Sequence, residues 1–381
     1  MSKKVIADVF LEVANAIESG EFGEKVKIGI TTLGSEHGVK NIVDGAELAA
    51  SGLFDIVLIG PKYDTDLEIV EVNDESDMHS KMEELLDSGY IDACVTMHYN
   101  FPIGVSTVGR VITPAKGKEM ILATTTGTSA TNRIEAMIRN AIYGISTAKS
   151  IGIKNPTVGI LNVDGARQVE KGLKELKDNG YDIEFADSIR ADGGCVMRGN
   201  DLLVGAPDVM VTDTLSGNIF MKIFSSFNTG GDFEAQGYGY GPGVGENYDR
   251  RVLILSRASG SPVVANALNY AYDVVKGSVN KVAKDEFSKA KKAKFDDVIS
   301  SLTKKESKVD SVEVKMPNKE VVTYQINGID IMDLEDAVSE LWKSGIYAES
   351  GMGCTGPIVL VNENKGGVSI DTLIKAGYTA N

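Results

Sequence analysis

The chain has 381 residues, 43% of them hydrophobic, and a formal net charge of −15 at pH 7. This length suits a folded protein of two or three domains, and the negative charge argues against nucleic acid or an anionic membrane as a partner. None of the three cysteines lies in a CxxC pair, so neither a disulfide framework nor a zinc or iron–sulfur site is expected. The N-terminus lacks an apolar signal segment and no apolar run approaches a membrane span, which predicts a cytoplasmic protein.

Residues 1–276 alternate short apolar runs with amphipathic stretches. Several of the apolar runs are nearly continuous, as in strands that are buried on both faces of a parallel sheet. We therefore predict an α/β domain over 1–276, with helices on both faces of a mainly parallel sheet. The predicted strands are 26–33, 55–60, 91–96, 120–125, 157–163, 208–212 and 252–256, and the main amphipathic stretches are 38–51, 132–150, 168–179 and 262–276.

Four predicted strands end in loops of glycine and hydroxyl side chains just before a helix: 34–38, 126–132, 214–218 and 257–262. Free N–H groups and the dipole at a helix N-terminus bind phosphate, and ligands of open α/β sheets lie at the carboxyl ends of the strands. We expect the four loops on one edge of the sheet, which favours an anionic substrate, although Ser and Thr before a helix are also ordinary N-caps. The chain has no GxGxxG in strand–turn–helix context and no GxxxxGK[ST], so NAD and ATP are not expected.

Several other residues could take part in binding or catalysis, and each also has a purely structural interpretation. His37, in the first loop, can bind phosphate or act as an acid, or it can cap or pack. Cys94 and His98 fall on one face of an extended segment, although a cysteine in such a strand is more often a small buried hydrophobe. Cys195 lies in a loop with no evident base nearby. The glycine- and tyrosine-rich segment 228–251 is either a lid or binding loop, whose tyrosines can pack on a partner protein, or a disordered surface loop.

A change of composition separates the end of the chain from this domain. Residues 277–308 are rich in Lys, Asp and Ser and predict a charged helical linker, which we interpret as a spacer. Strands over 311–315, 321–326 and 358–362 and a helix over 333–343 then predict a small α+β module over 309–381, joined by a hinge-like connection.

The module contains the phrase GMGCTGP at 351–357, with Cys354 at its centre. Glycines let backbone N–H groups converge, which can lower a thiol pKa and hold an oxyanion. Cys354 is therefore a candidate acyl-accepting nucleophile. The other interpretation is a buried cysteine beside a tight turn that precedes a strand.

Three motifs follow one another in an order that is typical of a known family: LGSEHG at 33–38, NPTVGILN at 155–162 and DTLSGN at 213–218. This pattern resembles the phosphate acyltransferases of phospholipid synthesis, over about residues 25–275. The resemblance implies the fold that these enzymes share with phosphotransacetylases and isopropylmalate dehydrogenases, a three-layer α/β/α arrangement. It also implies the formation of acyl phosphates from acyl-carrier-protein thioesters.

The whole chain resembles one branch more closely, the alpha subunits of protein C (component C) of glycine, sarcosine and betaine reductase complexes. The lipid enzymes lack the C-terminal module. The resemblance implies that Cys354 carries an acetyl thioester, with Cys94 as a candidate second thiol, and that phosphate releases acetyl phosphate during amino-acid fermentation. It further implies a ketoacyl-synthase-like beta subunit, a carboxymethylated selenoprotein A and inorganic phosphate as partners; a homo-oligomer is left open.

In this mechanism phosphate attacks the thioester on Cys354, and the backbone around Gly353, Thr355 and Gly356 stabilises the oxyanion. The predicted phosphate neighbours are His37, Thr126, Thr128, Ser216, Asn218 and Ser259. We expect no metal and no cofactor, with phosphate as a substrate. Two alternatives remain: a lipid-pathway phosphate acyltransferase that does not need Cys354, and a non-catalytic scaffold for a beta subunit.

Overall fold

The computed structural model describes residues 25–191, 193–303, 314–330, 333–353 and 356–379, together with Phe10 and Val13. The strands of its large sheet are β1 (Lys27–Thr31), β2 (Asp55–Gly60), β3 (Glu68–Glu71), β4 (Ala93–Thr96), β5 (Val105–Ile112), β6 (Glu119–Thr128), β7 (Thr157–Leu161), β8 (Glu184–Phe185), β9 (Val196–Met197), β10 (Val209–Val211), β11 (Gly241–Val244) and β12 (Val252–Ile254). The helices beside it are α2 (Gly38–Ala49), α3 (Glu75–Asp87), α4 (Arg133–Ser150), α5 (Ala166–Asp178), α6 (Gly199–Val204), α7 (Thr214–Ser226), α8 (Ser261–Lys276), α9 (Val279–Lys292) and α10 (Phe295–Thr303), with a 3₁₀ turn η1 (Phe227–Thr229).

Several helices begin where short polar side chains can cap them. The Asn132 side chain accepts hydrogen bonds from the backbone N–H groups of Ile134 and Glu135 at the start of α4. Asp213 does the same for Ser216 at the start of α7. These caps satisfy N–H groups that have no partner inside the helix, and they explain why the helices start directly after the strand-end loops.

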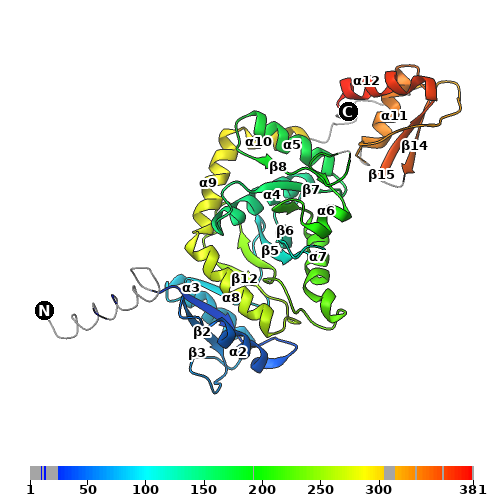
Figure 1. Ribbon diagram of the computed structural model, residues 1–381. Helices are drawn as coiled ribbons and strands as arrows, with labels where there is room; N and C mark the ends of the chain where they lie inside the picture. The colour runs from blue at the N-terminus through cyan, green and yellow to red at the C-terminus, as the bar shows by residue number, and fades with distance from the viewer. Residues whose placement is uncertain are drawn as a thin grey trace.

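The large sheet has the strand order β3-β2-β1-β4-β12-β11-β5-β6-β10-β7-β8, with β9 also paired to β7. Most neighbouring strands are parallel. One core cluster packs α2, α4, α5, α8, α9 and α10 against one face, and a second packs α3, α6 and α7 against the other. The predicted fold class, helices on both faces of a mainly parallel sheet, is confirmed (Figure 1).

The sheet contains a reversal of direction that the sequence did not indicate. Strand β11 is antiparallel to both β12 and β5, and β5 is antiparallel to β6. The set β1, β4 and β12 therefore runs opposite to the set β6, β10 and β7. The carboxyl ends of the two sets lie on opposite edges of the hydrogen-bonded sheet, so the expectation that all four loops share one edge is wrong.

The glycine-rich segment 228–251 includes a strand inside the sheet. Within it, β11 is buried along its whole length, and Tyr240 just before it is 5% exposed. Gly241 has a φ of +84°, and a Cβ there would lie 1.8 Å from the carbonyl oxygen of Val108. Glycine is needed because the backbones of β11 and β5 approach so closely. The predictions of a lid and of a disordered surface loop are both wrong for this part of the segment.

The charged stretch 277–303 packs on the α/β domain as α9 and α10. Val279, Ala283, Phe287 and Ala290 recur at helical spacing on α9 and are buried in the core cluster that covers α4. The interpretation of 277–308 as a spacer is therefore wrong for these two helices. Their charged residues are the solvated face of an amphipathic helix whose apolar stripe is narrow.

The last part of the chain forms a separate small α+β module (Figure 1). It contains β13 (Tyr324–Ile326), α11 (Leu334–Lys343), β14 (Ala348–Gly353), β15 (Gly356–Val361), a 3₁₀ turn η3 (Glu363–Lys365) and α12 (Gly366–Ala376). The strands form an antiparallel sheet in the order β13-β15-β14, and the module has its own hydrophobic core. The predicted strand at 321–326 is confirmed only for its last three residues, which form β13. No strand is present at 314–323, and residues 311–313 of the other predicted strand lie outside the described part of the chain.

The module contacts α5 of the α/β domain. The side-chain amide of Gln168 donates a hydrogen bond to Asp333 Oδ1 over 3.2 Å. Gly328 also lies beside α5, because a Cβ there would be 3.8 Å from Arg167 Nη2. Burial raises the pKa of Asp333, and the neighbouring carboxylates of Asp330 and Asp336 raise it further, although the Gln168 hydrogen bond opposes them.

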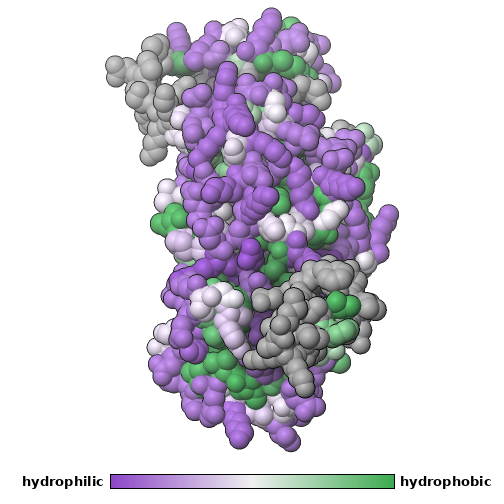
Figure 2. Space-filling view, turned by 90° about the vertical axis from the view of Figure 1, so that its left-hand side faces the viewer, coloured by the Kyte–Doolittle hydropathy of each residue, from purple (hydrophilic) through white to green (hydrophobic). Residues whose placement is uncertain are grey.

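The described surface is mostly hydrophilic on the face seen in Figure 2, with hydrophobic residues in small groups. This agrees with the strongly negative formal charge of the chain. Among the helices of the described residues, none has the length and apolar character needed to cross a membrane.

Candidate functional site

The predicted nucleophile, Cys354, lies outside the described residues, as does Thr355. The two residues that flank this pair in the sequence, Gly353 and Gly356, face each other in the antiparallel register of β14 and β15. The first half of the phrase GMGCTGP is thus part of a strand. The roles of Cys354 and Thr355, and of an oxyanion loop with Gly353 and Gly356, stay predictions.

The other two cysteines are buried in the α/β domain. Cys94 is 0% exposed on β4 and packs in an apolar cluster, where burial raises the pKa of its thiol far above the ordinary value. Burial, together with the Glu170 carboxylate 3.4 Å from its sulfur, raises the pKa of Cys195 to about 12. Because the thiolate is the nucleophile, this burial disfavours Cys94 as a second catalytic thiol, and that role stays a prediction.

The hydrogen bonds show a polar cluster beyond the carboxyl end of β12, formed by Lys222, Glu234, Ser256 and Ser259. The ammonium group of Lys222 donates to Glu234 Oε1 over 2.6 Å and to Ser256 Oγ over 2.8 Å. The carboxylate of Glu234 is 0% exposed and also accepts a hydrogen bond from Ser259 Oγ over 2.9 Å. We call these four residues the Lys222 cluster.

The Lys222 cluster has the features of a site for an anionic ligand. The Lys222 side chain is 46% exposed, so its ammonium group reaches solvent although its counter-ion is buried. Ser256 Oγ accepts hydrogen bonds from Lys222 and from the backbone N–H of Ala258. Its own proton therefore stays available for a ligand oxygen. Beside it, the guanidinium group of Arg257 is half exposed and 3.4 Å from the carboxylate of Glu75.

Two of the predicted phosphate neighbours lie close to this cluster. His37 is exposed, its Nε2 lies 3.3 Å from the carbonyl oxygen of Ala258, and its ring packs edge-on against Phe233. Ser259 is 1% exposed and its hydroxyl proton is engaged by Glu234. Ser259 thus orients the carboxylate, and its role as a direct phosphate ligand stays a prediction.

Thr126, Thr128 and Ser216 lie at the opposite edge of the sheet, around the ends of β6 and β10, whereas Asn218 lies on α7 one helical turn before Lys222. Thr126 shares a hydrogen bond of 2.9 Å with Thr107, and Thr128 is exposed at the last position of β6. The hydroxyl of Ser216 donates to the Asp213 carboxylate, and the amide of Asn218 donates to the carbonyl oxygen of Thr125. Ser216 and Asn218 therefore fix the start of α7, where the Asp213 carboxylate is paired with the Arg133 guanidinium group over 3.2 Å. Their role as phosphate neighbours stays a prediction.

Sequence reasoning missed Lys222, Glu234 and Ser256. Ser256 ends a predicted strand, which was a usable signal, because ligands gather at strand ends. Lys222 lies in the middle of α7 and Glu234 in the glycine-rich segment, and nothing in their local sequence indicates that they meet. Among the described residues, no three His, Cys, Asp or Glu side chains form a group that can hold a metal ion.

Comparison with known proteins gives one match over nearly the whole chain and others over part of it. The model of a family described as "Fatty acid synthesis protein" matches residues 26–360. The component C subunit alpha of the glycine/sarcosine/betaine reductase complex of Peptoclostridium acidaminophilum is 65% identical over 381 residues, which cover 99% of each chain. A phosphate acyltransferase of Thermotoga petrophila is 29% identical over 235 residues, covering 52% of this chain and 67% of its own.

Among solved structures, a branched-chain phosphotransacylase from Enterococcus faecalis V583 is similar to this chain. It has 18% sequence identity and a TM-score of 0.49, and the match covers 66% of this chain and 99% of its own.

Proposed function

The chain belongs to the fatty acid synthesis protein family, alongside the component C subunit alpha of the reductase complex, and from this premise we propose that it transfers an acetyl group to phosphate. The 65% identity over the whole length, C-terminal module included, is the observation that supports this proposal most strongly. An acyl-transfer role also agrees with the similarity to phosphate acyltransferases. The specific reaction is our inference.

In the proposed reaction the acetyl group is carried as a thioester on Cys354. A phosphate oxygen attacks the thioester carbonyl, the new C–O bond forms, and the C–S bond breaks. The sulfur leaves as thiolate and takes up a proton, and acetyl phosphate is released. Backbone N–H groups near Cys354 would stabilise the oxyanion.

The Lys222 cluster and Arg257 are the groups that we assign to the attacking phosphate. The Lys222 ammonium group and the Arg257 guanidinium group are partly exposed, and Ser256, which directly precedes Arg257, accepts a hydrogen bond from Lys222 through its hydroxyl. Buried Glu234 holds Lys222 in place, so the positive charge is oriented before the ligand arrives. Such preorganised charge stabilises a developing anion at little reorganisation cost.

We further propose that the chain works in the cytoplasm within a reductase complex, with a ketoacyl-synthase-like beta subunit and a carboxymethylated selenoprotein A as partners. Inorganic phosphate is the substrate, and no other cofactor takes part.

The test runs the proposed reaction in reverse, with acetyl phosphate as the donor and the cysteine thiol as the acceptor. The full-length protein is incubated with labelled acetyl phosphate, and the labelled residue is mapped by mass spectrometry. We expect the acetyl group on Cys354 and none on a Cys354→Ser variant, while Cys195→Ala serves as the matched thiol control and keeps the label. Label that persists on Cys354→Ser contradicts the thioester.

The same preparation separates the two alternatives. Turnover of acyl-carrier-protein thioesters by Cys354→Ser would identify a lipid-pathway phosphate acyltransferase. Binding of the beta subunit without either reaction, and without any effect of phosphate, would identify a scaffold.

A further inference from the structure

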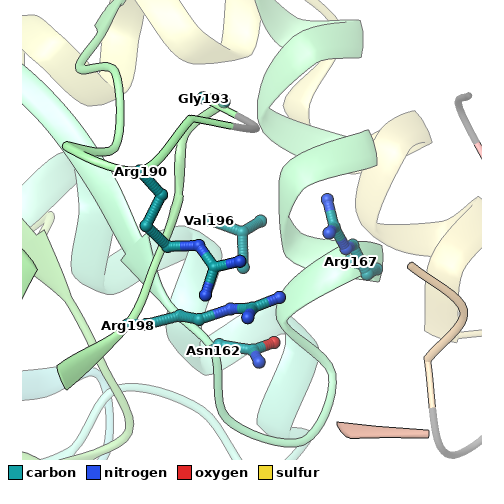
Figure 3. A pocket seen from close by; sticks show the side chains of 7 residues that line it. Asn162, Arg167, Arg190, Gly193, Val196 and Arg198 are labelled. Carbon is teal, nitrogen blue, oxygen red and sulfur yellow. The ribbon is translucent and has the colours of Figure 1, made fainter. Parts of the chain in front are cut away.

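A pocket lined by three arginines lies away from the Lys222 cluster, at the carboxyl ends of β7 and β9. Its lining is Asn162, Arg167, Arg190, Gly193, Gly194, Val196 and Arg198. Asn162 directly follows β7, Arg198 directly follows β9, and Arg167 is in the first turn of α5. In Figure 3 the side chains of Arg190 and Arg198 extend side by side, Asn162 lies next to Arg198, and Arg167 faces them from α5.

The pocket concentrates positive charge in a chain that is strongly negative. Three of its lining residues are arginines, and none of the described lining residues is acidic. Arg167 forms an ion pair with Glu170, with 2.9 Å between Nη1 and Oε2. Burial raises the pKa of Glu170, but hydrogen bonds from Lys174 and Arg167 outweigh it and keep that carboxyl ionised. The net charge of −15 makes a chance gathering of guanidinium groups at one strand end less expected than in a basic protein.

One guanidinium nitrogen in the pocket lacks a hydrogen-bond partner among the described residues. Arg198 Nη1 is buried and has no hydrogen-bond partner among the described residues, although the backbone N–H of Arg198 donates to Asp201 Oδ2 over 2.8 Å. A buried charged donor without an acceptor is costly, so an external acceptor is expected in the pocket. The start of α5 has no side-chain cap, and its N-cap is Gly165, so its first N–H groups add a favourable dipole for an anion.

The volume of the pocket limits the ligand to a small group. It is about 40 Å³, whereas roughly 10–15 Å³ suffices for one water. This is room for the oxygens of one phosphate or carboxylate group. The forked N–H groups of arginine match phosphate oxygens, and a phosphate group offers more acceptor oxygens and more negative charge than a carboxylate, so phosphate is the better match.

We propose that Asn162, Arg167, Arg190 and Arg198 form a binding site for a phosphate group, separate from the Lys222 cluster. The site lies next to the C-terminal module, because Arg167 Nη2 is 3.8 Å from the position of a Cβ on Gly328 and the neighbouring Gln168 bonds Asp333. The phosphate group comes either from free inorganic phosphate or from a phosphate monoester. This inference does not depend on the proposed acetyl transfer.

The test is protection of arginines from phenylglyoxal in the full-length protein, with each modified residue quantified by mass spectrometry. Saturating inorganic phosphate should slow the modification of Arg190 and Arg198 by about tenfold or more, the effect expected of charge-assisted hydrogen bonds. Arg250, which is held by Asp87 and Glu83, is the internal reference and should react at an unchanged rate. Phosphopantetheine is the monoester probe, and acetate at equal ionic strength is the carboxylate probe.

Three variants localise the effect. Arg198→Gln should abolish the protection of Arg190, and Arg198→Lys should keep only part of it, because lysine retains the charge but not the fork. Lys62→Gln removes one exposed charge elsewhere and should leave protection intact. A thermal unfolding scan checks that each variant is folded. If Arg198→Gln does not fold, the protection of the wild-type arginines by phosphate, phosphopantetheine and acetate decides whether the site exists.

Each outcome counts for or against the site. Protection by inorganic phosphate alone identifies free phosphate as the source, and stronger protection by phosphopantetheine identifies a monoester. The proposal is overturned if neither probe protects the wild type, if acetate protects equally well, or if a folded Arg198→Gln variant still shows protected Arg190.

Discussion

At the scale of single residues, Glu234 organises the proposed phosphate-facing cluster. Its carboxylate is 0% exposed and is compensated by the Lys222 ammonium group and the Ser259 hydroxyl. A buried charge of this kind is tolerated only when it is paired and hydrogen-bonded. Glu234 is therefore a positioning residue, which holds Lys222 beside Ser256 rather than contacting a ligand.

Glu234→Gln should lower both the stability of the protein and the proposed acetyl transfer to phosphate. The amide keeps the shape but loses the charge that Lys222 needs, so the free energy of unfolding should fall by about 1–3 kcal/mol. The KM for phosphate should also rise, because the ammonium group is no longer fixed. Urea denaturation and steady-state kinetics measure the two effects. In the control, Lys40→Gln removes an exposed ion pair with Asp44 and should change stability by less than about 1 kcal/mol; equal effects of both variants would contradict the role of Glu234.

The two buried thiols predict a specific dependence on pH. Unfolding exposes thiols that ionise near an ordinary pKa of 9.0, whereas the folded pKa of Cys195 is raised to about 12 and that of Cys94 is raised as well. The stability contributed by each protonated thiol is complete below pH 9 and is lost as the pH rises toward the folded pKa. The loss is at most about 1.4 kcal/mol per pH unit for each thiol.

Alkylation kinetics check this expectation. At pH 8, iodoacetamide should label Cys94 and Cys195 only after unfolding in urea, and Cys195→Ala should flatten part of the stability loss between pH 9 and pH 12. Rapid labelling of Cys94 in the folded protein would restore it as a candidate nucleophile.

At the scale of elements, β11 controls the architecture of the sheet. It inserts between β12 and β5, antiparallel to both, and so joins two sets of strands that run in opposite directions. The close approach of the backbones depends on Gly241, since a Cβ would lie 1.8 Å from the carbonyl oxygen of Val108. Neither the polarity nor the length of the surrounding loop indicates this role.

Gly241→Ala should be strongly destabilising. Alanine at a φ of +84° costs about 1–2 kcal/mol, and the displacement of β5 adds about 1–3 kcal/mol. The control is Gly89→Ala, where φ is +72° but nothing lies within 4 Å of the new methyl group, so only the backbone cost of about 1–2 kcal/mol remains. Urea midpoints compare the two, and equal losses would show that β11 does not pack as described.

At the scale of the whole molecule, the α/β domain and the C-terminal module have separate hydrophobic cores. Two clusters cover the faces of the large sheet, and a third lies inside the C-terminal module. The described contacts between module and domain include the polar Gln168–Asp333 hydrogen bond, and no described core cluster spans both parts. Cores without shared packing are expected to unfold independently.

The single tryptophan makes this expectation measurable. Trp342 lies in α11, packs against the module core and donates a hydrogen bond to the carbonyl oxygen of Ala348. Its fluorescence therefore reports the module, whereas far-ultraviolet circular dichroism mainly reports the larger domain. We expect two different urea midpoints from the two signals; coincident midpoints in the full-length protein would mean that the parts unfold as one unit.

Much of the fold was predictable because local patterns determine it. Strands such as β2 and β7 are nearly continuous apolar runs, and α4 begins at a recognisable Asn132 cap. Strands β5 and β11 were missed: β5 mixes apolar residues with Ser, Thr, Gly and Arg, and β11 contains two glycines and a proline. Helices α9 and α10 were predicted as helical but not as part of the core, because their apolar stripe is narrow among many charges.

The sequence by itself determined the α/β class, the helix starts and the C-terminal module, because hydrophobic periodicity and capping act over a few residues. Only the tertiary structure decided which polar groups meet. Lys222, Glu234 and Ser256 come from a helix, a glycine-rich segment and a strand end, and the antiparallel insertion of β11 separated loops that had been assigned to one edge. These contacts depend on the order and direction of the strands. Both are set by pairing between segments far apart in the sequence, so no local sequence pattern indicates them.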